Sequence, residues 1–242
     1  MATVDIVIPV LNEEYSLPRC LERLMEFLQN NLKYDWRITI ADNGSTDRTF
    51  EIANKYQQAS PERIGVIHLT QRGRGRALKK AWMESDAQVV SYMDVDLSTD
   101  LESFPTLIEA IVDEKNQIAW GSRLSMESMT KRSFKRELIS RSYNILIRMI
   151  MRTHFKDAQC GFKALSCHTA RAIIPKIKDN EWFFDTELLI VAEKNGLKGK
   201  EIPVGWTEDP DSRVKVFRTA LQDIKGLMRL RFGGIPNVFP SD

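Results

Sequence analysis

Two aspartates that follow a short apolar segment are the residues best suited to chemistry in this chain. Residues 89–93 read as a strand, and Asp94 and Asp96 come directly after it. A buried parallel strand typically forms such an apolar run, and open α/β sheets bind ligands at the carboxyl ends of their strands. Carboxylates are preferred ligands of hard divalent cations, which substrate phosphates often share. The pair predicts a Mg²⁺ or Mn²⁺ site, with a solvent-facing strand end as the alternative.

Further acids follow two other expected strands: Glu13 and Glu14 after residues 4–10, and Asp42 after residues 36–41. Loops at one edge of a parallel sheet converge on a single crevice, so we expect these acids near the aspartate pair. Asp42 could accept a hydrogen bond from a nucleotide base or a sugar hydroxyl. Alternatively, it is a turn residue, because Asp-Asn-Gly-Ser is favourable turn chemistry by itself.

A turn rich in glycine and arginine spans residues 71–76. It could bring backbone N–H groups and the Arg74 guanidinium to a phosphate at the start of a helix. Its spacing matches neither a P-loop nor Gly-x-Gly-x-x-Gly, so an ATPase or a dinucleotide enzyme is not supported. A solvated basic turn is an equally good interpretation.

Strands and helices alternate through the first half of the chain. Apolar periodicity predicts helices between strands at residues 4–10, 36–41, 64–69, 89–93 and 118–121. This alternation indicates βαβ units and a mostly parallel sheet with right-handed crossovers. We therefore expect a nucleotide-binding half over residues 1–121. No linker separates it from the more helical residues 122–242, so the prediction is one domain over 1–242.

Composition is that of an ordinary globular domain, with 242 residues, 43% of them hydrophobic and 28% charged. The formal net charge is only +2, but lysine and arginine outnumber acids over residues 123–152 and 213–231. Such clusters favour an anionic partner: phosphates, an acidic membrane surface or nucleic acid. Aromatic side chains are not interleaved with them as base stacking requires, so nucleic acid is not expected.

The cysteines and the apolar runs bear on the compartment. Cys20, Cys160 and Cys167 are scattered and form neither a disulfide framework nor a zinc-like spacing, which favours a reducing compartment. Neither a signal peptide nor an uncharged run of about 20 apolar residues is found. We therefore expect a cytoplasmic protein attached peripherally to the membrane. The three histidines are isolated in the sequence, and we interpret them as structural.

Two amphipathic segments are candidates for membrane contact. Residues 134–151 carry a wide apolar arc and a basic face, and residues 216–232 have a similar pattern. A basic amphipathic helix can lie on a lipid surface or line a channel for a lipid tail. The alternative is a core helix with a solvated basic side.

The motifs at residues 9–14, 41–47, 72–77, 94–98, 121–123, 157–163 and 184–187 occur in the order found in one family. Together they resemble the family 2 glycosyltransferases of the GT-A fold. The branch that they resemble most transfers hexoses to polyprenyl phosphates, as dolichyl-phosphate mannose synthases and β-glucosyltransferases do. Asp-x-Asp-Leu-Ser-Thr and Asp-Ser-Arg-Val-Lys at residues 211–215 favour the glucosyltransferase side. The resemblance implies an α/β fold with a single, mostly parallel central sheet flanked by helices.

The resemblance also implies roles for individual residues. Pro9, Glu13 and Asp42 match positions that hold the base and ribose, and Arg74 matches the basic residue of a glycine-rich turn. Asp94 and Asp96 match the ligands of the metal and the diphosphate, and residues 159–163, which begin with Gln159, match a loop that lines the sugar site. The cations that match phosphate-binding positions on the donor or acceptor are Arg123, Arg136, Arg213 and Lys215. The expected catalytic residues are Asp96, Arg123 and Asp185.

The function expected from this resemblance is metal-dependent, inverting transfer of a hexose from a nucleotide diphosphate sugar to a polyprenyl phosphate lipid. Glucose from UDP-glucose is favoured over mannose from GDP-mannose. Alternatively, the acceptor is a saccharide hydroxyl, which needs a carboxylate base such as Asp185, Glu187 or Asp157. A nucleotide-sugar-binding scaffold is the non-enzymatic alternative. The expected partner is a cytoplasmic membrane surface or a membrane protein.

Overall fold

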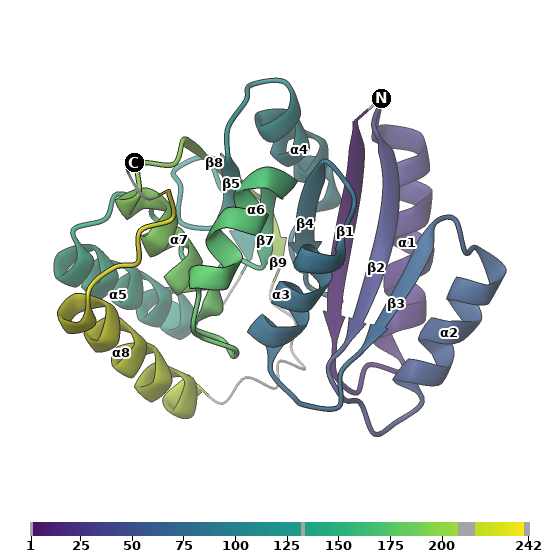
Figure 1. The fold of residues 1–242 in the computed structure, drawn as a ribbon, viewed down its shortest axis with the longest axis horizontal. Coiled ribbons are helices and arrows are strands. Elements are labelled where there is room, and N and C mark those ends of the chain that lie inside the picture. Colours follow the sequence, from purple (N-terminus) through teal and green to yellow (C-terminus); the bar gives the residue numbers. More distant parts are fainter. Residues whose placement is uncertain (1, 132–133, 208–215, 240–242) are drawn as a thin grey trace.

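The computed structural model describes residues 2–131, 134–207 and 216–239, in which helices cover both faces of a seven-stranded sheet (Figure 1). A separate pair of short strands, β6 and β9, lies outside it. The strands are β1 (Thr3–Val10), β2 (Asp35–Asp42), β3 (Ile64–His68), β4 (Val89–Met93), β5 (Ile118–Ser122), β6 (Thr130–Lys131), β7 (Phe162–Ser166), β8 (Gly199–Pro203) and β9 (Trp206–Thr207).

The strand order of the large sheet is β3-β2-β1-β4-β7-β5-β8, and every strand except β7 runs parallel to the others. The expected mostly parallel sheet is therefore confirmed. From β1 the chain first builds outward through β2 and β3 and then returns to place β4 on the other side. The carboxyl ends of β1 and β4 thus flank a topological switch point, where α/β sheets bind ligands.

Strand β7 was not predicted. It is antiparallel to both of its neighbours, β4 and β5. Its five residues, Phe-Lys-Ala-Leu-Ser, contain Lys163, whose side chain is fully buried. Lys163 interrupts the apolar run by which a buried strand is recognised. A lysine at such a position is read as exposed, because lysine is rarely buried unless it is paired.

The helices form two layers. The α-helices are α1 (Ser16–Asn31), α2 (Thr49–Ala59), α3 (Arg74–Glu84), α4 (Phe104–Val112), α5 (Phe134–Met151), α6 (Cys167–Ile173), α7 (Phe184–Lys194) and α8 (Val216–Gly233). Short 3₁₀ turns cover Leu101–Ser103 and Ile174–Lys176. Residues of α1, α2 and α4 share one core cluster, and residues of α3 and α5 to α8 share the other.

The alternation of side chains along β1 explains the two cores. Ile6 and Ile8 belong to the cluster beneath α1 and α4, whereas Val7 belongs to the opposite cluster. Successive side chains of a strand point to opposite faces, so a central strand buried on both sides is mostly apolar. This packing makes a rigid frame whose strand ends position the loops described next.

Candidate active site

The aspartate pair lies at the carboxyl end of β4, as its position after an apolar strand predicted. Asp94 Oδ1 is 2.5 Å from Arg74 Nη2, and the Asp94 side chain is 43% exposed. A Cβ atom at Gly161 would be only 1.8 Å from Asp94 Oδ2, so any side chain at this position of the loop before β7 would displace the carboxylate. Asp96 is exposed, and its Oδ1 accepts a hydrogen bond from the Ser98 backbone at 2.9 Å.

Arg74 links the aspartate strand to α7. It begins α3, is 8% exposed and donates from Nη1 to Asp185 Oδ2 at 2.7 Å as well as pairing with Asp94. Its guanidinium lies 5.0 Å from the Tyr92 ring centre and 5.1 Å from that of Trp182. Two carboxylates and two aromatic faces therefore compensate for the burial of this cation.

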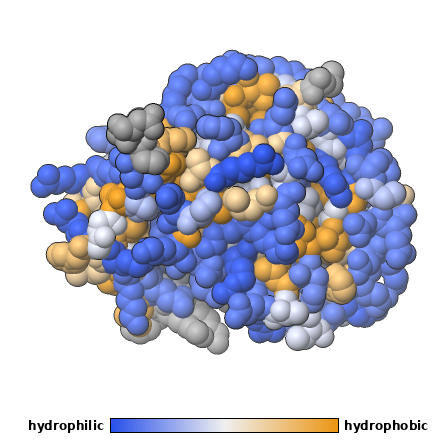
Figure 2. Space-filling model, viewed as in Figure 1, coloured by the Kyte–Doolittle hydropathy of each residue, from blue (hydrophilic) through white to orange (hydrophobic). Residues whose placement is uncertain are grey.

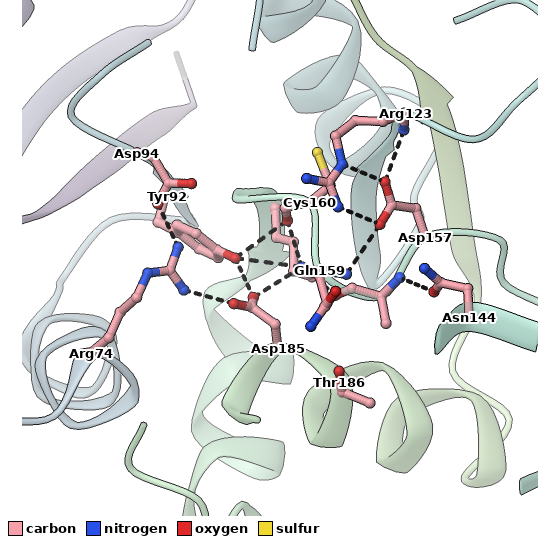
Figure 3. A network of polar contacts seen from close by, with 12 residues as sticks. Arg74, Tyr92, Asp94, Arg123, Asn144, Asp157, Gln159, Cys160, Asp185 and Thr186 are labelled. Carbon is pink, nitrogen blue, oxygen red and sulfur yellow. Dashed lines mark hydrogen bonds and ion pairs between the residues drawn. The ribbon is translucent and has the colours of Figure 1, made fainter. Parts of the chain in front are cut away.

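Asp185 is the centre of a buried polar network (Figure 3). Its Oδ1 is 2.9 Å from Lys163 Nζ and also accepts a hydrogen bond from the Tyr92 hydroxyl. Although burial opposes ionisation, Lys163 and Arg74 hold the pKa of Asp185 below its ordinary value. Lys163 also donates to the carbonyl oxygens of Cys160 at 2.7 Å and Ala158 at 3.1 Å. The network therefore fixes the loop before β7 against β4 and α7.

A second ion pair stabilises the other end of this loop. Arg123 Nε and Nη2 form a bidentate pair with the Asp157 carboxylate at 2.7 and 2.9 Å, and the Arg123 backbone donates to it at 3.0 Å. Asp157 is fully buried, which opposes its ionisation, but Arg123 keeps the pKa of Asp157 below its ordinary value. The Arg123 guanidinium also lies 5.5 Å from the Trp206 ring centre. Asp157 accepts from the Gln159 backbone at 3.2 Å, so the pair orders the segment that carries Gln159.

The expected base-binding residues lie at the ends of β1 and β2. Asp42 is fully buried, with Oδ2 2.6 Å from His68 Nδ1 and Oδ1 accepting from the Ser45 backbone at 3.2 Å. His68 is therefore not isolated in the fold; Phe50 packs on its ring with centroids 4.4 Å apart. Pro9 pairs with Ala41 in the β1–β2 register.

The loops behind these strands are linked to one another. The backbone N–H of Glu13 donates to Thr49 Oγ1 at 2.7 Å, which ties the loop after β1 to the start of α2. Asn43 Oδ1 accepts from the Gly73 backbone at 2.7 Å, which joins the loop after β2 to the basic turn. The strand ends that the sequence marked as acidic are thus connected to the turn that carries Arg74.

Arg74 contacts both Asp94 and Asp185, and Asp157 of the neighbouring loop holds Arg123 and the Gln159 backbone. The side chain of Arg136, and all of Arg213 and Lys215, lie outside the described residues. Sequence reasoning did not select Tyr92 or His68, and it placed Lys163 only at the end of the loop expected to line the sugar site. Only Lys163 had a usable signal, because a lysine inside an apolar strand needs a buried counter-charge.

Solved structures provide the first comparison. Glucosyl-3-phosphoglycerate synthase from Mycobacterium tuberculosis, crystallised with uridine diphosphate, superposes with a TM-score of 0.69 at 18% identity, covering 98% of this chain and 82% of that one. A second structure of that enzyme, with Mn²⁺ and UDP-glucose, gives a TM-score of 0.67 at 16% identity, covering 98% and 80%. The chain therefore shares the overall fold of that enzyme.

The glycosyl transferase family 2 model matches residues 5–174, and the chain belongs to that family. A dolichyl-phosphate β-glucosyltransferase of Dictyostelium discoideum is 32% identical over 95% of this chain and 74% of its own length. The human dolichyl-phosphate β-glucosyltransferase is 31% identical over 94% of this chain and 74% of its own length. Glycosyltransferase AglD of Haloferax volcanii is 34% identical over 90% of this chain, which spans about a third of that relative (35%). The expected fold and family are both confirmed.

The carboxylates at the end of β4 fit a divalent metal. Asp94 and Asp96 offer only hard oxygen ligands, the type preferred by Mg²⁺ and Mn²⁺. Within the described ranges, no cluster of three or more histidine, cysteine or acidic side chains could hold a metal without help. A site with two carboxylates therefore suits a cation that takes its remaining ligands from a substrate diphosphate and water.

Proposed function

We propose that this protein transfers glucose from UDP-glucose to a polyprenyl phosphate of the dolichyl type, with inversion at the anomeric carbon. The observation that supports this most is the cluster at the end of β4, where Arg74 contacts both Asp94 and Asp185. The names of the relatives support glucose and dolichyl phosphate, and the UDP-bound neighbours support the donor. In-line attack on an α-linked donor gives the β-linked product in those names.

On the donor side, we propose that Pro9, Glu13 and Asp42 contact the nucleoside, and that Gln159 contacts the hexose. Asp94 and Asp96 would hold Mg²⁺ or Mn²⁺, which neutralises the charge that the leaving diphosphate develops. Arg74 keeps Asp94 in place through the 2.5 Å pair, so the carboxylate is oriented before the donor arrives. Arg123 is proposed to stabilise the same leaving group.

On the acceptor side, the state of the buried acids favours a phosphate over a hydroxyl. A lipid monophosphate is already an anion at neutral pH and attacks without a general base. Asp185 accepts from Arg74, Lys163 and Tyr92, and Asp157 is held by Arg123, so neither is available to take a proton. Glu187 is fully buried and paired with Arg229 at 2.7 Å. We propose that Arg136, Arg213 and Lys215 help to bind the acceptor phosphate.

The test is a panel of donors and acceptors with purified protein. We expect UDP-glucose with Mn²⁺ or Mg²⁺ to raise the melting temperature more than GDP-mannose does, because a ligand that binds only the folded state stabilises it by mass action. We also expect labelled glucose to appear in extracted dolichyl phosphate and not in soluble saccharides. Transfer to saccharides alone, or from GDP-mannose alone, would support the alternative transferases. Binding without transfer to either acceptor would support a scaffold.

We propose further that the face formed by α5 and α8 rests on the cytoplasmic surface of a membrane. In the parts of the chain that the structure describes, no helix is both long and apolar enough to span a bilayer. Both helices nevertheless expose large apolar side chains, which lie in the region of α5 and α8 in Figure 2. These residues are Leu138, Ile145 and Met149 on α5, and Leu221, Ile224 and Met228 on α8.

Charge favours an anionic membrane as the partner of this face. Arg141 and Arg148 of α5 and Lys225 and Arg231 of α8 are all exposed. Apolar side chains that enter the interface, surrounded by cations that meet anionic headgroups, are typical of a helix lying on a membrane.

Charged substitutions on this face are expected to release the protein from vesicles. Ile145→Glu with Met149→Glu should reduce co-sedimentation with vesicles rich in phosphatidylserine at least about tenfold, since two carboxylates would enter the interface. The control is Gln58→Glu with Ala59→Glu, which adds the same charge to exposed positions of α2. Equal binding by both variants would contradict the assignment of this face.

A further inference from the structure

Asp223 is a buried acid on α8 that the proposed chemistry does not use. It is 2% exposed, and its Oδ2 accepts a hydrogen bond from Gln159 Nε2 at 3.2 Å. Its other oxygen, Oδ1, is buried and has no hydrogen-bond partner among the described residues. An unsatisfied buried carboxylate oxygen is costly and uncommon, so its presence calls for a reason other than stability.

Asp223 also differs from Asp157 and Asp185, two other buried acids, in its charge environment. No lysine or arginine of the described chain forms an ion pair with it, in contrast to Asp157 and Asp185. Burial raises the pKa of Asp223 to about 6, and the negative charges of Asp179 and Asp185 act in the same direction, whereas the Tyr143 hydroxyl lowers the pKa. An acid kept in such a place destabilises the fold relative to an apolar side chain.

Gln159 donates a hydrogen bond to Asp223 from the loop between α5 and β7, and the Tyr143 hydroxyl also interacts with the Asp223 carboxylate. Figure 3 shows Gln159 on the segment that runs from Asp157 to Cys160, whose carbonyl oxygen accepts from Lys163. An amide group can present either its oxygen or its NH₂ to a ligand, and a hydrogen-bonded neighbour selects between them. Because the Gln159 NH₂ donates to Asp223, the amide oxygen Oε1 is left to accept from a ligand.

We infer that Asp223 is a positioning residue that fixes the Gln159 amide so that its oxygen, and not its NH₂, faces the donor hexose. A hexose hydroxyl then donates to Gln159 Oε1. This inference rests on the proposed function, in which Gln159 contacts the sugar of UDP-glucose. It makes α8, which contributes to the proposed membrane face, part of the donor site as well. Sites that hydrogen-bond a sugar hydroxyl in this way discriminate strongly between orientations of that hydroxyl.

The experiment compares Asp223→Leu and Asp223→Asn with the wild type. Leucine removes the acceptor for the Gln159 amide, so we expect the KM for UDP-glucose to rise about tenfold, the loss of roughly one hydrogen bond. Binding of UDP, which lacks the hexose, should change less than about twofold. Asparagine keeps one acceptor oxygen and should restore most of the affinity. The urea midpoint of Asp223→Leu should equal or exceed that of the wild type.

A double-mutant cycle with Gln159→Ala provides the decisive comparison. If Asp223 acts through Gln159, Asp223→Leu should add less than about a twofold change in KM when Gln159 is already alanine. Independent effects of the two substitutions, or equal losses of UDP and UDP-glucose binding, would overturn the inference. So would an unchanged KM in an Asp223→Leu protein that remains folded. Glucose transfer by the wild type tests the proposed function separately, and its absence would overturn both.

Discussion

Replacing Asp94 with asparagine is expected to reduce glucose transfer about 100- to 1000-fold, the usual effect of removing one group that stabilises developing charge. Asparagine preserves the shape beside Gly161 but removes the charge that a divalent cation requires. The fold should tolerate the change, because Arg74 keeps its 2.7 Å contact with Asp185 and the Asp94 side chain is 43% exposed. Initial rates at saturating Mn²⁺, together with the melting temperature, measure both effects.

The matched control for this variant is Asp86→Asn, which removes the same charge from a fully exposed position before β4. We expect its rate and its metal-dependent stabilisation by UDP-glucose to equal those of the wild type. Asp94→Asn should lose the metal-dependent part of that stabilisation. A variant that keeps more than about a tenth of the wild-type rate would argue against a metal held at the end of β4.

Replacing Asp185 with asparagine is expected to lower the free energy of unfolding by about 3–5 kcal/mol, as removal of one partner from a buried ion pair typically does. Lys163, which is fully buried, would lose its only ion-pair partner among the described residues, and Arg74 would lose one of its two. The loss of stability is measured as a lower midpoint of urea unfolding, with an m-value equal to that of the wild type. Transfer should fall as well, because Arg74 orients Asp94.

The control is Glu84→Gln, which removes a carboxylate from an exposed pair with Lys80 one helical turn away. Such pairs contribute less than about 0.5 kcal/mol. A loss below about 1 kcal/mol in Asp185→Asn would contradict the importance of the network.

The stability that the Asp185 network contributes depends on pH, and the direction of this dependence follows from the lowered pKa of Asp185. Its partners hold the pKa of Asp185 below 3.8, so its ionised form stabilises the fold at every pH above that value. The stabilisation is lost as the pH falls through the lowered pKa. Between pH 5 and 8, the stability difference between the wild type and Asp185→Asn should therefore be constant. A difference that disappears near pH 6 would mean that Asp185 is not held ionised.

The strand ends illustrate how much of the site could be predicted. Asp94, Asp96 and Asp42 each follow an apolar run, and parallel strands place their carboxyl ends at one edge regardless of side-chain detail. Local periodicity therefore sufficed for the parallel strands and the position of the acids, and the motifs at the strand ends carried the family resemblance. Periodicity did not predict β7, because Lys163 can be buried in this strand only when it is paired with Asp185, which lies on α7.

The amino-acid sequence by itself determined the parallel framework and the placement of acids at its carboxyl edge, since both follow from short-range patterns of apolar and polar residues. Only the tertiary structure decided which charges neutralise one another. Arg74 meets Asp185, 111 positions away in the chain, and Gln159 meets Asp223 across 64. Such pairs form because burial in a low-dielectric interior makes an unpaired charge or amide costly, and the partner that relieves the cost is chosen by packing between elements and not by neighbours along the chain.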